Sequence, residues 1–417
     1  MKLLILLGNY WPKMYANGIC TNEVIKELVK RGHEIHVLCY SDSKMHKYEE
    51  EVNGIKLHMA RAPRFNRYRS TTYGEKNKIG WKIGYNYNKF ITRISTLLYL
   101  PLYPLNSIKM VYRYYKKANE IYHSEKYDLI MGVYKPFEAI AASTLIGKNI
   151  KEVKSGIYIL DTLIDQQAPP IIKWWLDKSG WFWEKRLYKY NDFIINMISY
   201  ENIYKNRRYD KFKNKIFFSD IPLYTNRKVT LTNNNQKPNK RKWLYAGTLS
   251  RNTRNPEYLC KIFMDKKINV DNELHFYSNG NCEEIITEYS KKALAVFQHG
   301  FVSRRKILKE LYESDVLVSI GNRKSNMVPS KIFEYISIGK KIIHFYFDNN
   351  DSCIKYLRKY ENSLLVDEKK DIKDNVAAIN NFIESKETIT DFRFIDKNFE
   401  LNKPSYTADI IEKIIDL

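Results

Sequence analysis

Cysteine is scarce in this sequence of 417 residues, and its spacing excludes two kinds of small scaffold. The five copies are Cys20, Cys39, Cys260, Cys282 and Cys353. Their number is odd and no Cys-x-x-Cys motif occurs, which argues against a disulfide framework and against a zinc ribbon. A reducing compartment fits this pattern. Because the N-terminus also lacks the cleavage site of a secretory signal, we expect a cytoplasmic protein.

Long hydrophobic runs are missing as well. No segment reaches the roughly 18 uncharged apolar residues that a transmembrane helix needs. The nearest candidate, residues 94–108, is interrupted by Pro101 and Pro104. We therefore expect a protein that is soluble or bound to the periphery of a membrane.

The common catalytic and nucleotide-binding motifs are absent from the sequence. It contains no Gly-x-Gly-x-x-Gly, Walker A, His-Glu-x-x-His or Gly-x-Ser-x-Gly motif. The eight histidines are scattered, and the closest pair, His33 and His36, flanks the start of an expected strand. A structural role is the favoured interpretation of both. The sequence thus predicts no metal site and no cofactor.

Acidic residues are outnumbered by basic ones. The chain has 70 Lys and Arg against 47 Asp and Glu, which gives a net charge of +23. Such a charge predicts attraction to polyanions, whether nucleic acid, an anionic leaflet or a phosphorylated substrate. A solvated basic surface without a partner is the alternative interpretation. Hydrophobic residues make up 44% of the chain, as in globular proteins, which excludes a wholly disordered chain.

Apolar runs typical of strands alternate with segments of helical periodicity, which predicts parallel α/β layers. At the N-terminus a strand at 2–7, a loop at 9–18, a helix at 19–30 and a strand at 35–40 form a βαβ unit. Further strands are expected at 129–133, 156–160, 194–198, 216–218, 243–246, 274–277, 316–320 and 341–346, and further helices at 137–146, 256–264, 305–313 and 330–338.

A polar stretch at 226–242 divides this rhythm into two similar α/β halves. It contains Pro238 and three consecutive asparagines, a composition typical of linkers. We therefore predict an N-terminal domain at 1–225, a linker at 226–242 and a C-terminal domain at 243–400.

One segment of the first half, residues 76–117, mixes Lys and Arg with many aromatic residues. This mixture suits a helix that lies in a membrane interface and is attracted by anionic lipid. It would also suit single-stranded nucleic acid, but no known nucleic-acid-binding module is present, and we predict no such partner. The remaining interpretation is an amphipathic helix that packs on its own domain. The aromatic residues are Trp81, Tyr85, Tyr87, Phe90, Tyr99, Tyr103, Tyr112, Tyr114 and Tyr115.

The first candidate site in the second half is the loop that follows the strand at 243–246. Gly247 stands at the expected end of this strand, where a glycine lets a ligand approach the backbone. Open α/β sheets bind ligands at such strand ends. Arg251 and Arg254 follow, and two guanidinium groups can hold a diphosphate through paired hydrogen bonds. A polar turn with two solvated arginines is the alternative interpretation.

The second candidate site is the start of the helix expected at 330–338. Pro329 suits its first turn and Gly339 its C-terminal cap. The free N–H groups of a helix N-terminus can hold a phosphate, and Lys331 adds a full positive charge there. Glu334 lies one turn further on the same face, where its carboxylate could accept hydrogen bonds from two ribose hydroxyls. The alternative is that Lys331 and Glu334 form an exposed ion pair.

These residues resemble a known family. Residues 329–343 read Pro-Ser-Lys-Ile-Phe-Glu-Tyr-Ile-Ser-Ile-Gly-Lys-Lys-Ile-Ile, which looks like the donor-site signature of retaining GT-B glycosyltransferases, the group called family 4 or group 1. Three further pieces stand in the family's order: Tyr-Ala-Gly-Thr-Leu at 245–249, Gln-His-Gly-Phe-Val at 298–302 and Ser-Asp-Val-Leu-Val-Ser-Ile-Gly-Asn at 314–322. The start of the chain, with Gly18 and Arg-Gly-His-Glu-Ile at 31–35, is also similar.

The resemblance implies a GT-B fold, in which two Rossmann-like domains face each other across a cleft. The second domain would bind a nucleotide-sugar, usually UDP-linked, and the acceptor would lie mainly against the first. A C-terminal helix within 401–417 would pack back on the first domain.

The resemblance also assigns roles to individual residues. Glu334 would bind the ribose, and Lys331 and Arg254, with Arg251, would hold the diphosphate. Gly18 matches the loop of the first domain that closes on the phosphate. The donor site would further include Gly247, Gly300, Asn322 and Ser330.

Two positions depart from the family's pattern. Asn326, which we also assign to the donor site, stands where the first of two glutamates is usual. Its amide could still hydrogen-bond a sugar hydroxyl, but the identity of the sugar becomes less certain. Many members have a histidine at a strand end near the reacting sugar, but the sequence here runs Tyr158-Ile159-Leu160-Asp161. Asp161 is the candidate substitute, with a turn or helix-cap role as the alternative.

The predicted mechanism needs no metal, because the Asp-x-Asp motif of metal-dependent sugar transferases is absent. Lys331, the arginines and backbone N–H groups would stabilise the charge that develops on the departing diphosphate. In this family the departing phosphate is thought to deprotonate the acceptor hydroxyl. We predict a hexosyltransferase-like enzyme that extends a lipid-linked or growing glycan of the cell surface at the inner face of the plasma membrane. A non-catalytic GT-B-like subunit that binds a partner enzyme or a glycan is the alternative.

Overall fold

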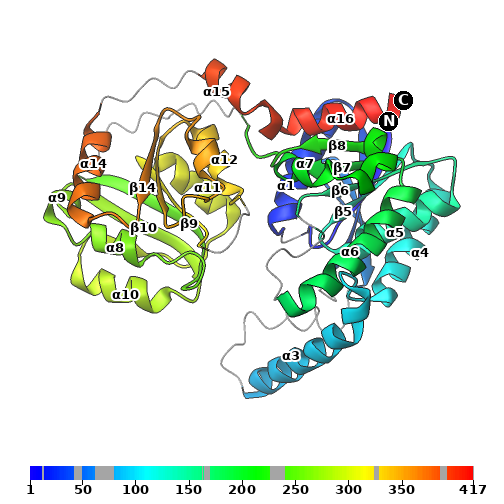
Figure 1. Cartoon of the computed structure of the whole chain (residues 1–417), viewed down its shortest axis with the longest axis horizontal. Helices are drawn as coiled ribbons and strands as arrows, with labels where there is room; N and C mark the ends of the chain where they lie inside the picture. Colours follow the sequence, from blue (N-terminus) through cyan, green and yellow to red (C-terminus); the bar gives the residue numbers. More distant parts are fainter. Residues whose placement is uncertain are drawn as a thin grey trace. The chain divides into compact units, whose positions relative to one another are not determined.

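The computed structural model divides the chain into two compact units (Figure 1). Unit 1 comprises Met1–Pro222 and Leu401–Leu417, and unit 2 comprises Leu223–Glu400. The predicted linker at 226–242 lies mostly outside the described residues, as do Asn326 and the side chains of Trp81 and Tyr85. The structure describes residues 1–11, 14–41, 49–61, 79–161, 163, 170–225, 240–323, 328–385 and 392–416.

Unit 1 is built on an eight-stranded sheet with the order β3-β4-β2-β1-β5-β6-β7-β8. All neighbouring strands run parallel except β3, which pairs antiparallel with β4. The strands are β1 (Lys2–Leu6), β2 (Glu34–Ser41), β3 (Glu49–Val52), β4 (Ile55–Arg61), β5 (Leu129–Tyr134), β6 (Lys154–Ile159), β7 (Phe193–Met197) and β8 (Ile216–Ser219). The strand order reverses between β1 and β5, which creates a switch point where open α/β sheets bind ligands.

The helices of unit 1 cover both faces of this sheet. Because side chains alternate along a strand, Leu3 and Ile5 of β1 pack toward α1 (Ala16–Lys30) and α16 (Pro404–Asp416). Leu4 and Leu6 pack toward the other face, against α4 and α5. Among the described residues of this unit, the other α-helices are α3 (Ile79–Tyr99), α4 (Ile108–Ser124), α5 (Phe137–Asn149), α6 (Pro170–Tyr190) and α7 (Glu201–Tyr204).

The C-terminal helix α16 lies beside α1 (Figure 1). The Arg31 guanidinium donates to Asp409 and to Glu412, both at 2.6 Å, and His33 Nε2 lies 2.7 Å from Glu412 Oε1. Ala408 joins the same core cluster as α1. His33 therefore helps to hold α16 on unit 1.

Helix α1 begins earlier than the sequence pattern predicts. The expected loop extends to residue 18, but α1 starts at Ala16, so Gly18 lies in its first turn. A Cβ atom at Gly18 would lie 3.0 Å from Asn9 O and 3.5 Å from Met14 Cβ. The glycine therefore lets the chain that follows β1 pass close to the start of α1.

The basic aromatic segment forms two helices with different surroundings. The apolar face of α4 is buried in the core through Met110, Tyr114 and Ala118. Helix α3 instead exposes much of its apolar surface, and it has no acidic residue. Packing on its own domain is thus correct for α4 but not for the apolar face of α3. Within the described parts of the chain, no helix combines the length and the apolar character needed to cross a bilayer.

Unit 2 contains a six-stranded, fully parallel sheet with the order β11-β10-β9-β12-β13-β14. Its strands are β9 (Arg241–Leu249), β10 (Asn272–Gly280), β11 (Val296–Gln298), β12 (Val316–Ile320), β13 (Lys341–Tyr346) and β14 (Ser363–Asp367). Its helices are α8 (Glu257–Ile262), α9 (Lys266–Asn269), α10 (Glu283–Lys292), α11 (Arg304–Glu313), α12 (Lys331–Ile338), α13 (Ile354–Leu357), α14 (Ile372–Glu384) and α15 (Phe392–Asn398). The strand order reverses between β9 and β12, which places a second switch point at their carboxyl ends.

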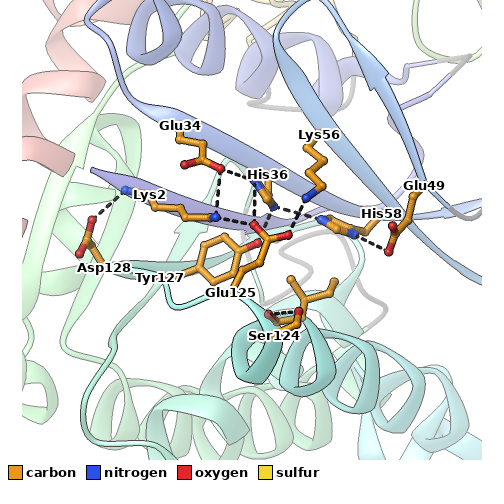
Figure 2. A network of polar contacts seen from close by, with 11 residues as sticks. Lys2, Glu34, His36, Glu49, Lys56, His58, Ser124, Glu125, Tyr127 and Asp128 are labelled. Carbon is orange, nitrogen blue, oxygen red and sulfur yellow. Dashed lines mark hydrogen bonds and ion pairs between the residues drawn. The ribbon is translucent and has the colours of Figure 1, made fainter.

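A polar network lies at the amino ends of β1, β2 and β4, and thus at the opposite end of these strands from the switch point of unit 1 (Figure 2). His36 Nδ1 lies 3.1 Å from His58 Nε2, and His36 Nε2 lies 3.0 Å from Glu34. Glu34, His36 and Glu125 are close enough to hold a metal ion. However, Lys2 pairs with both carboxylates and Lys56 with Glu125. These ammonium groups already neutralise the carboxylates, so the geometry favours a structural network.

Candidate active site

The candidate active site lies in unit 2, where β9 and β12 end. After β9 the chain makes a tight turn in which Ser250 N donates to Arg254 O at 3.1 Å and Arg254 N donates to Ser250 O at 2.8 Å. This turn directs Arg254 back toward the neighbouring strand end. Its Nε donates to Asn322 Oδ1 at 2.7 Å, so two residues predicted from separate motifs lie together.

A buried carboxylate positions Asn322. Asp351 Oδ2 accepts the Asn322 N–H at 3.0 Å, and Asp351 Oδ1 accepts the Cys353 N–H at 2.7 Å. His344, Asp351 and Cys353 are buried with their polar atoms close enough to bind a metal ion. Because both oxygens of Asp351 already accept backbone N–H groups, we assign this carboxylate the role of holding Asn322 in place.

Lys331, at the start of α12, reaches back to β9. Its Nζ donates to Ala246 O at 2.7 Å, while the hydroxyl of Tyr335, one turn later, accepts the Ala246 N–H at 3.2 Å. Gly247 has a φ of +156°, and a Cβ atom there would lie 3.3 Å from Lys331 Nζ. Gly247 lies within β9, which extends to Leu249, and not after the strand as the sequence pattern suggests.

The Lys331 ammonium is poorly solvated in this position. Burial is the main cause that lowers the pKa of Lys331; Glu334 opposes it, the charges of Arg304 and Arg254 add to it, and together these effects bring the pKa to about 8. An ammonium group has three donors, and the Ala246 carbonyl accepts from one of them. An anion beside Lys331 would therefore stabilise its charged form.

Glu334 lies one turn beyond Lys331, but the two side chains do not form the exposed ion pair that the sequence left open. The Glu334 carboxylate instead forms a bidentate ion pair with Arg304, the first residue of α11. No motif in the sequence points to Arg304. Its local signal is its place directly after the 298–302 motif and the Ser303 N-cap of α11.

Arg251 is not part of this cluster. Its Nη2 donates to Glu284 at 2.7 Å and its Nε to Asn281 O at 3.3 Å. Glu284 belongs to the acidic first turn of α10, where the helix dipole favours a carboxylate, and this carboxylate binds the guanidinium. The predicted pairing of Arg251 with Arg254 on one diphosphate is therefore not supported by the geometry.

Two further predicted residues shape the backbone near the site. Gly300 adopts a φ of +68°, in the left-handed region that favours glycine, just before the chain enters α11. Ser330 is the N-cap of α12, and its side chain makes no capping hydrogen bond to that helix. Asn326, the remaining residue of the predicted set in this unit, lies outside the described residues.

The other two predicted residues belong to unit 1. Gly18 lies in the first turn of α1, and the neighbouring Asn17 Nδ2 donates to Tyr134 O at 2.8 Å, which ties α1 to the end of β5. Asp161 follows β6, and its carboxylate lies 2.8 Å from Lys135 Nζ. Both residues thus lie near the carboxyl ends of the unit 1 strands.

Solved structures of similar fold cover the whole chain. Sucrose-phosphate synthase from Thermosynechococcus elongatus matches with a TM-score of 0.65 and 12% identity over 99% of this chain and 98% of its own. Anabaena HepE, solved with UDP and glucose, matches with a TM-score of 0.55 and 13% identity over 100% of this chain and 99% of its own. WaaG, a glycosyltransferase involved in lipopolysaccharide biosynthesis, matches with a TM-score of 0.57 and 10% identity over 98% of this chain and 99% of its own.

Sequence comparisons are negative by contrast. No protein-family model and no curated protein matches the chain. The likeness to solved structures therefore concerns the fold, and it agrees with the two Rossmann-like sheets and their switch points. The chain has the GT-B fold, as the resemblance of its C-terminal half predicts.

Proposed function

We propose that this protein is a glycosyltransferase that takes a sugar from a nucleotide-sugar donor bound by unit 2. The observation that carries the proposal is the position of Lys331. A half-buried ammonium at the start of a helix lies beside Gly247, with Arg254 and Glu334 close by, at the switch point of an open α/β sheet. A phosphate group and a ribose one helical turn apart would match this arrangement.

The donor would be held through its diphosphate and its ribose. Lys331 and Arg254 supply positive charge, and the N-terminus of α12 supplies N–H groups and a partial positive charge. Glu334 would accept hydrogen bonds from the two ribose hydroxyls. HepE was solved with UDP, which supports a UDP-linked donor for this chain.

The reaction we propose is transfer with retention and without a metal ion. The acceptor hydroxyl oxygen forms a bond to the anomeric carbon, the bond from that carbon to the diphosphate breaks, and the departing diphosphate takes the hydroxyl proton. Lys331 and Arg254 stabilise the negative charge that grows on the diphosphate. Asp161, beside Lys135, remains our candidate on the acceptor side. The family resemblance supports the retaining course.

The acceptor we propose is a lipid-linked or growing glycan of a cell-surface polysaccharide. The structural likeness to WaaG, which is involved in lipopolysaccharide biosynthesis, supports this class of acceptor. Such an acceptor would bring the protein to the inner face of the plasma membrane.

Helix α3 provides the surface for such a location. Seven of its apolar and aromatic residues are exposed, and at 100° per residue they share one face: Ile83, Tyr87, Phe90, Ile91, Ile94, Leu97 and Leu98. On the same helical projection Arg93 flanks this face, and Lys89 lies nearly opposite it. Between Glu75 and Glu120 the sequence has nine Lys and Arg and no acidic residue. We therefore propose that α3 lies in the interface of an anionic membrane.

The end of α3 is fixed to the rest of unit 1. Directly after it, the backbone carbonyls of Leu100 and Leu102 accept hydrogen bonds from Trp175 Nε1 at 3.4 Å and Trp183 Nε1 at 3.0 Å. These indole groups lie two turns apart on α6. A membrane bound to α3 would therefore be coupled to the body of unit 1.

Vesicle binding tests the proposed role of α3. We expect the protein to co-sediment with vesicles that contain phosphatidylglycerol at low salt and less at high salt, because salt screens the basic residues. Replacing both Leu97 and Leu98 with aspartate should lower the partition coefficient by about tenfold or more, because two apolar side chains no longer leave water.

A matched control is offered by Leu294, which is 91% exposed but belongs to unit 2. Leu294→Asp should bind vesicles like the unmodified protein. If the unmodified protein stays in the supernatant at low salt, or if the Leu97/Leu98 variant binds equally well, the role of α3 is wrong.

A thermal-shift screen of nucleotide-sugars tests the donor site itself. A UDP-sugar at 100 times its Kd should stabilise the folded protein by ~2.7 kcal/mol, whereas nucleotides that do not fit should leave the melting temperature unchanged. Stabilisation that is accompanied by transfer or donor hydrolysis supports the enzyme. Binding without either reaction would favour the non-catalytic GT-B-like subunit, for which Asn326 in place of the usual glutamate is the motivating observation.

A further inference from the structure

The pair between Arg304 and Glu334 brings together two residues with different surroundings. Nη1 of Arg304 lies 3.0 Å from Oε2 of Glu334, and Nη2 contacts Oε1, so the guanidinium engages both carboxylate oxygens. The Glu334 side chain is 10% exposed and that of Arg304 is 40% exposed. Arg304 therefore covers the carboxylate on the side that faces solvent.

We propose that Arg304 is a latch that closes the ribose subsite in the free protein and is displaced by the ribose hydroxyls of the donor. This inference rests on the proposed function, in which Glu334 receives the ribose. A vicinal diol and a guanidinium present the same pattern to a carboxylate, namely two parallel donors for its two oxygens. A ribose that arrives from solvent must therefore replace Arg304 to bind Glu334 in this way.

The position of Arg304 suits a contact that can open. It is the first residue of α11, directly after the Ser303 N-cap and four residues after Gly300 with its φ of +68°. The first turn of α11 holds Arg304, Arg305 and Lys306 and no acidic residue. Because the positive end of the helix dipole repels cations, Arg304 gains little from its own helix, and its bidentate pair with Glu334 is the contact that must open.

The latch has a thermodynamic consequence that differs from that of a positioning residue. If the closed form dominates in the free protein, the factor by which the ribose hydroxyls increase the association constant is multiplied by the fraction of protein that is open. An ion pair of this exposure with bidentate geometry shifts such an equilibrium by about fivefold. Removing Arg304 should therefore strengthen the ribose contact, whereas removing a residue that orients Glu334 would weaken it.

The test compares the Kd of UDP with that of 2′,3′-dideoxy-UDP by calorimetry at fixed ionic strength. The ratio of the two constants isolates the ribose hydroxyls, because both ligands carry the same diphosphate. In Arg304→Ala this ratio should rise by about fivefold. In Arg305→Ala, which removes one exposed charge from the same turn, it should equal that of the unmodified protein.

The variant Glu334→Gln separates failure of the latch from failure of the proposed donor site. If the unmodified protein prefers UDP over the dideoxy analogue and Glu334→Gln loses this preference, Glu334 is the ribose ligand. With that established, an unchanged or lower ratio in Arg304→Ala overturns the latch and leaves the proposed function intact. If the unmodified protein binds neither ligand, the donor site and the latch are both wrong. If it binds both equally, or if Glu334→Gln keeps the preference for UDP, Glu334 is not the ribose ligand and the latch is wrong, whereas the diphosphate site stands.

Discussion

Replacing Lys331 with alanine should reduce the kcat of sugar transfer by about 10²–10³, the loss typical of removing one donor that stabilises developing negative charge. The ammonium is held beside Ala246 O by a 2.7 Å hydrogen bond, in a place where burial weakens its solvation. Such a preorganised charge needs little rearrangement when the diphosphate departs, so its effect on the transition state is large.

The pH dependence of donor binding follows from the same environment. The pKa of Lys331 is about 8 in the free protein, and a bound diphosphate would raise it because the anion favours the charged form. Above pH 8 donor binding must therefore take up a proton, and the Kd of UDP should increase by up to about tenfold per pH unit. In Lys331→Ala this pH dependence should disappear, and calorimetry between pH 7 and 9.5 would measure it.

Lys309→Ala is the matched control for Lys331→Ala. Lys309 lies on the exposed side of α11 in the same unit and contacts Glu313 at 3.6 Å. Its loss removes the same net charge without touching the site, so turnover should stay unchanged. Turnover of Lys331→Ala at the level of the unmodified protein would remove Lys331 from the mechanism, provided that the variant keeps its folding temperature.

The sequence was sufficient to predict those parts of the donor site whose signal lies within a single helix or strand. The helix that contains Lys331 and Glu334 and a strand at 243–246 could be predicted, because glycine, proline and periodicity act over a few residues, although that strand extends to Leu249. The partners of the charged side chains could not be predicted from the sequence. Arg304 reaches Glu334 across 30 residues and Arg251 reaches Glu284 across 33, and such pairs depend on how helices pack on the sheet.

The segment at 76–117 shows a second limit of local patterns. Both α3 and α4 alternate apolar and polar residues with helical spacing, and the sequence could not tell which face would be covered. In the structure, Met110 and Tyr114 of α4 are buried against the sheet and α5, while Leu97 and Leu98 of α3 are exposed. Amphipathicity predicts that one face of a helix will be buried, and the tertiary structure determines which surface covers that face.

Acidification should destabilise unit 1 by about 3 kcal/mol between pH 6.5 and 4 through His58 alone. Burial lowers the pKa of His58 to about 4, with the neighbouring His36 adding to the effect, whereas an unfolded histidine titrates near 6.5. In this pH window the unfolded chain binds a proton that the folded chain does not, so the free energy of unfolding falls as the pH falls. The slope fades above about pH 7.5, where the histidine is neutral in the unfolded chain as well.

The partners of His58 show why the folded state resists this proton. Its Nε2 lies 3.1 Å from His36 Nδ1, so a charge on one ring opposes a charge on the other (Figure 2). Glu49 lies 3.3 Å from Nδ1 and would favour the charged form, but Lys117 lies 3.6 Å from the same carboxylate and weakens that effect. The unfavourable contributions of burial and His36 therefore dominate.

Urea unfolding followed by tryptophan fluorescence measures this effect, because six of the seven tryptophans lie in unit 1 and Trp243 alone in unit 2. His58→Gln should flatten the dependence of the unfolding free energy on pH between 6.5 and 4, even if it lowers stability at pH 7. His123→Gln should keep the full slope, since His123 is exposed on α4. An equal slope in the His58 variant and the unmodified protein would mean that His58 is protonated in the folded state, and the network at the amino ends of the strands would then hold a charged imidazole.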